Sequence, residues 1–200
     1  MSRDLETLRR DYLVSSLDES DAGNDPMALF ARWFEDAKKS EQLEPNAMTL
    51  ATVDAFGRPH ARVVLLKGRF ENRFSFYTNY LSHKGQQLQA SPFAALCFWW
   101  DRLERQIRIE GRVRKLSSSE SDMYFHARPR SSRLGAWASA QSEVIESHKT
   151  LELKMIELEE KYPEDIPRPA HWGGYEVIAD RIEFWQGRSS RLHDRIDFTK

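Results

Sequence analysis

Hydrophobic side chains near the start of the chain recur at intervals of three or four residues, which is the spacing of one helix face. They are Met27, Phe30, Trp33, Phe34 and Ala37. Asp25 is a favoured N-cap residue, and Pro26 suits the first position of a helix. We therefore predict a helix that begins at residue 26 and buries one of its faces.

The middle of the chain has the patterns of β-strands. Strands are predicted over residues 48–53, 60–67, 74–79, 93–100 and 106–115, which are rich in apolar and β-branched residues. The last of these alternates between apolar and polar positions, as a half-buried strand does. The segment 93–100 is nearly all apolar, which predicts a strand buried on both faces. Ser82 is expected to cap a short helix that ends near Ala90.

Helices and two further strands are predicted in the last part of the chain. Ser117 resembles the cap of a helix that runs to about residue 127, where Pro129 stops it. A second helix is predicted over residues 143–162, and strands over 174–179 and 181–186 follow. The apolar seam of that second helix is Val144, Leu151, Met155, Leu158 and Tyr162. Because strands and helices do not alternate regularly, we predict a mainly β protein, an antiparallel barrel with flanking helices.

Composition limits the organisation and the partners of the protein. The chain has 200 residues, a hydrophobic fraction of 40% and a formal net charge of -1. Residues 1–24 are polar and irregular, which predicts a mobile N-terminal arm before a single domain at 25–200. With so little net charge, neither nucleic acid nor a membrane surface is an expected partner. The start of the chain lacks the pattern of a signal peptide, so a cytoplasmic location is expected.

Metal and thiol chemistry are not expected. The six histidines are scattered without the spacing of metal ligands. The sequence contains no phosphate-binding loop, dinucleotide-binding glycine motif or nucleophile elbow. The single cysteine, Cys97, lies in an apolar run and is interpreted as a small buried side chain.

Positively charged residues lie close to aromatic residues at several places. Arg62 and Lys67 bracket a predicted strand, where positions five apart should point to opposite faces. Lys84 lies near the start of a predicted helix, which favours anions. Tyr124 and Arg128 are four apart, on one face of a helix.

A similar cluster lies near the end of the chain. Arg191, His193 and Arg195 alternate and would share one face of an extended segment, with Trp185 just before them. Arginine and lysine bind phosphates, and tryptophan offers a stacking surface, so the set suits two phosphates and a flat heteroaromatic ring. The same residues also fit solvated surface charges and a salt-bridged strand end. Composition and spacing leave both interpretations open.

Five segments, taken together, resemble the pyridoxine/pyridoxamine 5'-phosphate oxidases, a family of FMN-binding split β-barrels. They are 62–67 (RVVLLK), 76–79 with 82–84 (FYTN, SHK), 103–106 (LERQ), 124–130 (YFHARPR) and 183–187 with 191–195 (EFWQG, RLHDR). Residues 135–137, 141–142 and 172–174 also agree. The resemblance covers nearly the whole chain in order, and it implies a homodimer with FMN at the subunit interface.

The resemblance also implies roles for individual residues. The FMN contacts it implies are Arg62, Val63, Val64, Leu65, Leu66, Lys67, Tyr77, Thr78, His83, Lys84, Gln106, Gln141, Ser142, Trp185 and Arg195. The substrate contacts it implies are Lys67, Tyr124, Arg128 and Ser132 around the phosphate, Arg191, Leu192 and His193 over the pyridine ring, and the covering segment Arg9, Arg10, Asp11 and Tyr12. Arg191 and His193 are the expected catalytic residues.

The implied reaction belongs to vitamin B6 metabolism. Pyridoxamine 5'-phosphate or pyridoxine 5'-phosphate loses two electrons at C4' to give pyridoxal 5'-phosphate, and O2 is reduced to hydrogen peroxide. Two departures from the family pattern matter. His83 stands where the family usually has arginine, which removes a permanent charge near the flavin phosphate. The chain also stops at Lys200, before the Trp-containing segment with which family members usually end; this predicts reduced final strand pairing, unless the sequence is part of a longer chain.

Three other kinds of protein remain as alternatives. One is a related flavoprotein oxidase that acts on another aromatic ring, as in relatives that make phenazines. The joint presence of Lys67, Tyr124, Arg128, Arg191 and His193 argues against it. The second is a non-catalytic protein that binds flavin or vitamer, and the third is a purely structural module. Release of peroxide on addition of pyridoxamine 5'-phosphate in air distinguishes an oxidase from a binding protein.

Overall fold

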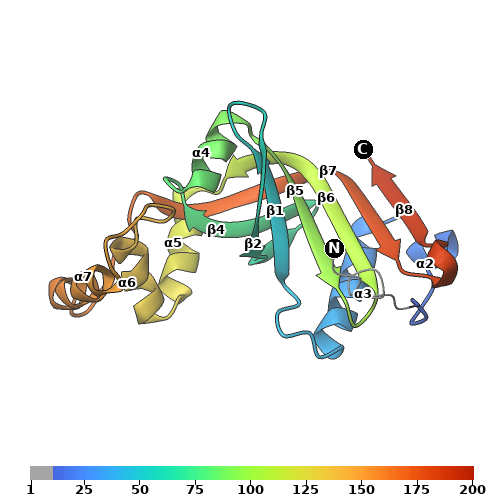
Figure 1. The fold of residues 1–200 in the computed structure, drawn as a ribbon, viewed down its shortest axis with the longest axis horizontal. Coiled ribbons are helices and arrows are strands. Elements are labelled where there is room, and N and C mark those ends of the chain that lie inside the picture. The colour runs from blue at the N-terminus through green and yellow to red at the C-terminus, as the bar shows by residue number, and fades with distance from the viewer. Residues whose placement is uncertain (1–10) are drawn as a thin grey trace, which may run out of the picture.

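A computed structural model describes residues 11–200 and shows one antiparallel sheet with helices around it (Figure 1). The order of its strands is β2-β1-β5-β6-β7-β4-β3, and β8 pairs with β7. The strands are β1 (Ala47–Val53), β2 (Pro59–Leu65), β3 (Gly68–Phe70), β4 (Arg73–Asn79), β5 (Phe93–Trp100), β6 (Arg105–Lys115), β7 (Trp172–Gln186) and β8 (Asp194–Thr199). The sheet curves into a half-barrel, which confirms the predicted mainly β, split-barrel fold.

The helices lie at several places around this sheet: some at its left end in Figure 1, one above it, and others toward its right end. They are α2 (Glu19–Ala22), α3 (Pro26–Lys39), α4 (His83–Ala90), α5 (Ser118–Ala127), α6 (Arg130–Ala138) and α7 (His148–Lys161), with a 3-10 turn at Ser189–Arg191. The predicted caps are confirmed: Asp25 accepts from the N–H of Met27 at 2.8 Å, and the Ser82 side chain caps α4. Ser117 and Glu120 form a reciprocal capping box at the start of α5.

The main core lies between α3 and the concave face of the sheet. Phe30 on α3 is fully buried, and its ring contacts Phe74 edge-on with centroids 5.1 Å apart and Phe98 at 5.5 Å. One turn away, Trp33 meets Phe184 at 5.3 Å. Burial of such aromatic side chains contributes several kcal/mol each, so this contact holds α3 firmly against the sheet.

A smaller core holds the helices at the other end of the sheet together. Its buried members are Phe125, Leu134, Ile166 and Trp172. Arg168 ties α5 to the start of β7, because its guanidinium donates to Asp122 at 2.6 Å and to the carbonyl of Trp172 at 2.6 Å. The position of α5 relative to β7 is therefore set by both packing and hydrogen bonds.

The long strand β7 replaces the two closing strands that were predicted. It pairs with β6 along its length, and the register shifts at one point, where Glu110 faces Arg181 but Gly111 faces Ala179. Asp180 is therefore an extra residue in β7, a β-bulge that leaves the strand unbroken. The predicted boundary at residue 180 corresponds to this bulge.

Other predictions on the elements need correction. The helix predicted over 143–162 starts only at His148, and Val144 is 99% exposed rather than part of the seam. The strand over 93–100 is buried on one face only, since Phe93 and Trp99 are 55% and 46% exposed in the single chain. The sequence patterns did not predict β3, α6 or β8, nor α2, which forms in the segment that was expected to be irregular. Because β8 pairs with β7 along its whole length, the expected loss of final strand pairing is not seen.

The described part of the N-terminal segment lies against the end of the barrel that carries β8. The backbone N–H of Val14 donates to the Glu104 carboxylate at 3.0 Å, and that of Leu17 donates to Asp194 at 2.9 Å. Leu17 is buried, and α2 follows it. These contacts give residues 11–24 a defined place; the mobility and the domain boundary predicted for the arm stay predictions.

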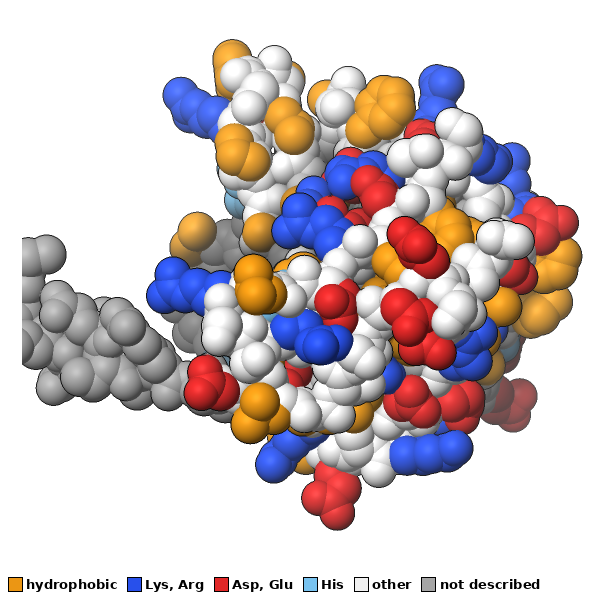
Figure 2. Space-filling view, turned by 90° about the vertical axis from the view of Figure 1, so that its right-hand side faces the viewer, with side chains coloured by type: hydrophobic (Ala, Val, Ile, Leu, Met, Phe, Trp, Pro, Cys, Tyr) orange, Lys and Arg blue, Asp and Glu red, His pale blue; other side chains and the backbone are white. Residues whose placement is uncertain are grey.

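Acidic and basic side chains are interspersed over the face that Figure 2 shows, where β8 and α2 lie. No large patch of one sign is visible on the described part of this face, in line with the net charge of -1. None of the helices formed within residues 11–200 has the length and apolar character needed to traverse a bilayer.

Candidate functional site

A cavity of about 540 Å³ lies between β2, β4 and the end of α5. Its lining residues come from distant parts of the chain: Arg62, Val63, Val64, Leu65, Lys67, Tyr77, Thr78, Asn79, Lys84, Tyr124, Arg128, Gln141 and Trp172. All of them except Asn79 and Trp172 were assigned to FMN or substrate from the sequence. The cavity thus unites segments that the sequence alone left separate.

Four cations line this cavity: Arg62, Lys67, Lys84 and Arg128. Among the residues 11–200, none of the four forms an ion pair with a carboxylate. Lys84 is 8% exposed, and its pKa is lowered by burial and by the nearby charge of Arg62. Burial also lowers the pKa of Arg128. Such a cluster is costly unless an anion balances it.

One nitrogen of this cluster lacks any acceptor. Nη1 of Arg128 is buried and has no hydrogen-bond partner within the described part of the chain. A buried donor left unpaired costs about 1–3 kcal/mol. The carbon at the centre of this guanidinium lies 4.5 Å from the centroid of the Trp172 ring, a cation–π contact that holds it in place.

Stacked aromatic rings form one wall of the cavity. The rings of Tyr77 and Tyr124 stack with centroids 3.9 Å apart, and Tyr77 also stacks on Trp172 at 5.5 Å. The pKa of Tyr77 is raised, first by burial and then by Tyr124. The stack fixes the position of the Tyr124 side chain next to Arg128.

Polar groups from the loop after α6 reach the same region. The side-chain oxygen of Gln141 accepts from the Thr78 hydroxyl at 3.1 Å and from the N–H of Asn79 at 3.3 Å. The Ser142 hydroxyl accepts from the N–H of His83 at 3.3 Å, and Ser142 has a left-handed φ of 77°. A non-glycine residue held there is a mark of a constrained loop, often a functional one.

A second group of predicted residues gathers at the far end of β7. Trp185 and His193 have ring centroids 4.6 Å apart, and Tyr12 contacts both rings, at 5.9 Å and 5.7 Å. The backbone N–H of Arg188 donates to Nδ1 of His193 at 3.0 Å. Gln106 and Arg195 are the direct neighbours of Trp185 on the strands at either side.

The two groups lie at opposite ends of one strand. Gly174 of β7 pairs with Tyr77, whereas Trp185 lies eleven positions further along the same strand. At about 3.3 Å a residue, the strand between them is about 36 Å long. One chain therefore presents two partial sites, which a single small ligand bound to that chain does not bridge.

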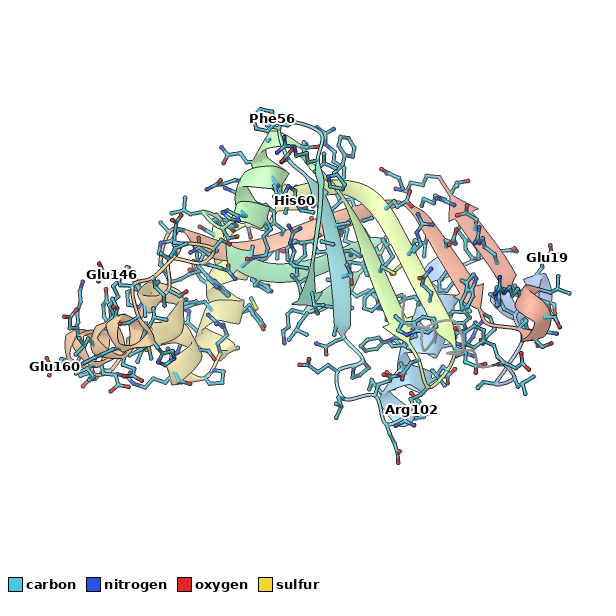
Figure 3. All side chains as sticks on the ribbon, viewed as in Figure 1. Glu19, Phe56, His60, Arg102, Glu146 and Glu160 are labelled. Atoms are coloured by element: carbon cyan, nitrogen blue, oxygen red, sulfur yellow. The ribbon has the colours of Figure 1, made fainter. Side chains whose placement is uncertain are left out.

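Several predicted site residues lie elsewhere. Leu66 is buried in the main core, and Ser132, in the first turn of α6, is not among the residues that line the cavity. The His83 side chain lines a separate hollow with Asp54 and His60, near the β1–β2 hairpin and α4 where Figure 3 labels His60. Arg9 and Arg10 fall outside the described residues.

Two geometric expectations were wrong. Arg62 and Lys67 line the same cavity instead of pointing apart, because β2 ends at Leu65 and the alternation ends with it. Arg191 does not continue an extended segment with His193, since it lies in the 3-10 turn with a φ of 62°. Leu192, beside it, is 78% exposed.

Sequence reasoning gave no role to four residues at this site. Asn79 and Trp172 line the cavity. Thr52 and Gln87 lie outside its lining and accept hydrogen bonds from Arg62. Trp172 lies in the Trp-Gly-Gly segment, which was noted but not given a function. Thr52 and Gln87 carry no motif, so only the three-dimensional packing of β1 and α4 reveals them.

Known proteins match the chain over almost its whole length. Residues 34–162 match the family described as Pyridoxamine 5'-phosphate oxidase, and residues 172–200 match the Pyridoxine 5'-phosphate oxidase C-terminal dimerisation region. A pyridoxine/pyridoxamine 5'-phosphate oxidase of Burkholderia multivorans is 58% identical over 98% of this chain and 92% of its own. One of Azotobacter vinelandii is 57% identical over 99% and 94%.

Solved structures agree on the fold. The crystal structure of PhzG from Burkholderia lata, in complex with tetrahydrophenazine-1-carboxylic acid, matches with a TM-score of 0.87 and 29% identity, over 94% of this chain and 93% of its own. A pyridoxamine 5'-phosphate oxidase-related, FMN binding protein from Nostoc punctiforme matches with a TM-score of 0.67 at 17% identity, over 89% and 100%. The second likeness concerns the fold alone.

Proposed function

The chain belongs to the pyridoxamine 5'-phosphate oxidase family, and on that basis we propose how its residues carry out the reaction of that family. The protein is an FMN-dependent oxidase that converts pyridoxamine 5'-phosphate or pyridoxine 5'-phosphate to pyridoxal 5'-phosphate and reduces O2 to hydrogen peroxide. With the amine substrate, water hydrolyses the oxidised carbon–nitrogen bond, supplies the aldehyde oxygen and releases ammonia. The observation that carries the assignment of residues is the cavity with four cations and no balancing carboxylate among the described residues.

The residues present fit two phosphorylated ligands. Lys84 is buried without an acid partner in the described chain, and Arg128 directs an unpaired buried nitrogen that needs an acceptor. Phosphate oxygens supply such acceptors and the missing negative charge. We assign Arg62 and Lys84 to the FMN phosphate, and Lys67, Tyr124 and Arg128 to the substrate phosphate. Thr78 and Gln141 contribute hydroxyl and amide groups beside the flavin.

FMN, when bound, would supply the redox chemistry, the transfer of two electrons from the substrate to O2. The protein supplies position. Anchoring of the substrate phosphate by Lys67 and Arg128 restricts where C4' lies, so much of the rate enhancement comes from proximity and orientation. The stacked wall of Tyr77, Tyr124 and Trp172 keeps this anchor rigid and excludes water from one side.

His193 acts through a fixed hydrogen-bonding pattern. Because the N–H of Arg188 donates to Nδ1, that nitrogen holds a lone pair and the neutral ring carries its proton on Nε2. Nε2–H is therefore a donor, suited to orient the amino or hydroxyl group on C4' rather than to remove a proton. Arg191, in the constrained turn next to it, is proposed to contact the same part of the substrate.

The homologous C-terminal dimerisation region indicates a homodimer. We infer that the two partial sites of one protomer each join the opposite partial site of its partner, with FMN between the subunits. The cavity with the cations would come from one protomer, and Trp185, His193 and Arg195 from the other. Support comes from the length of β7 between the two groups and from the exposed Trp99 and Phe93 on the outer face of the sheet.

A direct assay tests the function. The protein is purified with added FMN and mixed with pyridoxamine 5'-phosphate in air, and both the aldehyde product and peroxide are measured. The expected result is equal amounts of both. Pyridoxamine without phosphate is the control, and comparable turnover of that compound would contradict the phosphate anchor. It would instead favour an oxidase for an unphosphorylated ring, as the likeness to PhzG would suggest.

A further inference from the structure

We propose that Thr52 and Gln87 are positioning residues: they hold the Arg62 guanidinium in the orientation that binds the flavin phosphate. Neither residue lines the cavity itself. The inference rests on the proposed function, because it takes FMN as the ligand of Arg62. It adds two residues whose effect on binding is indirect.

The three side chains are joined by hydrogen bonds, and Nη1 of Arg62 donates in addition to the backbone carbonyls of Leu50 at 3.2 Å and His60 at 3.4 Å. Nη1 of Arg62 donates to the Thr52 hydroxyl at 2.5 Å, and Nη2 donates to the amide oxygen of Gln87 at 2.9 Å. The Thr52 hydroxyl in turn donates to the same amide oxygen at 2.6 Å. Both terminal nitrogens of the guanidinium are therefore fixed from one side. Nε, in contrast, has no acceptor among the described residues, which leaves it for a ligand.

The two holding residues are buried and come from different elements. Thr52 on β1 is 2% exposed and Gln87 on α4 is 8% exposed. Gln87 lies three residues after Lys84, so both point from one face of α4 towards the barrel. The same helix thus carries Lys84, the second phosphate-binding cation, and Gln87, which holds Arg62. We call Thr52 and Gln87 together the clamp on Arg62. Buried polar groups that satisfy each other in this way are rigid.

Neutral residues around Arg62 suit a phosphate site better than an acidic residue would. Thr52 and Gln87 are neutral acceptors, so they orient Arg62 without cancelling its charge. A carboxylate in the place of Gln87 would hold the guanidinium more strongly but would compete with the phosphate for it. The repulsion between Arg62 and Lys84, which helps to lower the pKa of Lys84, also calls for a clamp that fixes Arg62 until an anion binds.

The experiment compares the binding of FMN with that of riboflavin, which has the same ring but lacks the phosphate. Flavin fluorescence is titrated against the full-length apoprotein, and the ratio of the two dissociation constants is the readout. Thr52→Val and Gln87→Leu remove the clamp. Thr52→Ser keeps the hydroxyl, Gln87→Glu adds a charge, and Gln89→Leu changes an exposed residue of α4 as the matched control. The Tm of each apoprotein is measured in parallel.

If the clamp acts on the phosphate site, its removal should weaken the binding of FMN but not that of riboflavin. Thr52→Val and Gln87→Leu should each weaken FMN binding about tenfold, the effect of losing one hydrogen bond to a charged group, and leave riboflavin binding unchanged. Gln87→Glu should weaken FMN binding further without lowering the Tm. Thr52→Ser and Gln89→Leu should bind both flavins as the wild type does.

Two results would overturn the proposal. If FMN and riboflavin affinity fall together, Thr52 and Gln87 support the fold and not the phosphate site. If neither affinity falls, Arg62 needs no clamp. A wild-type protein that binds FMN no better than riboflavin is a separate outcome, because it would reject the phosphate site of the proposed function itself and the clamp with it.

Discussion

The backbone N–H of Arg188 donates a hydrogen bond to Nδ1 of His193 over 3.0 Å. A backbone amide cannot act as an acceptor through its N–H, so this contact fixes the tautomer of the ring. The tilted contact of the ring with Trp185, with centroids 4.6 Å apart, limits its rotation. His193 is thus held as a hydrogen-bond donor with a defined direction.

The donor role of His193 leads to a test by substitution. His193→Ala should lower kcat by roughly 100-fold, the usual effect of removing one well-placed donor, while FMN stays bound. His193→Gln, whose amide nitrogen donates but does not accept a proton, should retain more activity than His193→Ala. Steady-state kinetics and the flavin absorbance of each purified variant check both points. Equal loss in the two variants would contradict a donor role.

Arg128 should act mainly on the binding of substrate. Its Nη1 is a buried donor without a described partner, and Trp172 holds the guanidinium from one face. Arg128→Ala should raise KM for pyridoxamine 5'-phosphate by about 10- to 100-fold, as expected for a lost hydrogen bond to a charged group. Arg128→Lys keeps the charge without the planar guanidinium, so its KM should lie between those of the wild type and Arg128→Ala. An unaltered KM in Arg128→Ala would refute the phosphate anchor.

Lys84 should make FMN binding sensitive to pH in the alkaline range. Burial and the charge of Arg62 lower the pKa of Lys84 in the free protein, so Lys84 loses its proton at a lower pH than an ordinary lysine does. A bound phosphate favours the charged form, and FMN affinity should therefore fall as the pH rises through this lowered pKa. Fluorescence titrations over the alkaline range measure the effect.

The same ionisation affects folding in the opposite direction. Between the lowered pKa of the folded state and the higher one of the unfolded state, the unfolded chain binds more protons, so the contribution of Lys84 to stability rises with pH. Lys84→Met should remove both dependences. If Lys84→Met keeps the alkaline loss of FMN affinity, another group is responsible.

The composite site can be tested by mixing two impaired variants and measuring activity at a substrate concentration far below the raised KM of Arg128→Ala. Arg128→Ala damages the cavity with the cations, and His193→Ala damages the other partial site. If each complete site takes one part from each protomer, a mixed dimer contains one intact site and one doubly damaged site. Random exchange of subunits should then restore about a quarter of the wild-type activity, because half of the dimers are mixed. Activity that stays at the level of the separate variants would mean that both parts of a site come from one protomer.

Local patterns in the sequence predicted most of the elements, because caps and alternation depend on neighbouring residues. The caps at Asp25, Ser82 and Ser117 are examples. The patterns failed where packing against distant segments decides the outcome. The strand β3 has only three residues, too few for a pattern, and the exposed Val144 is apolar without being buried.

The candidate site was predictable only in part, for the same reason. The family resemblance identified most of the residues that line the cavity, since these lie in motifs. Thr52 and Gln87 could not be found in this way, because each is an ordinary residue of a strand or helix until β1, β2 and α4 come together. The placement of Arg191 also escaped prediction, because its left-handed backbone breaks the extended pattern.

The extra residue Asp180 determines which side chains at the end of β7 face the core and which face outward. Before it, Tyr175, Val177 and Ala179 face the core; after it, Ile182 and Phe184 do, so odd positions give way to even ones. Trp185 therefore points outward, although an uninterrupted count from Tyr175 would place it inside. Removing this one residue would exchange the inner and outer side chains over the last third of the strand and bury the indole that the second protomer is proposed to meet.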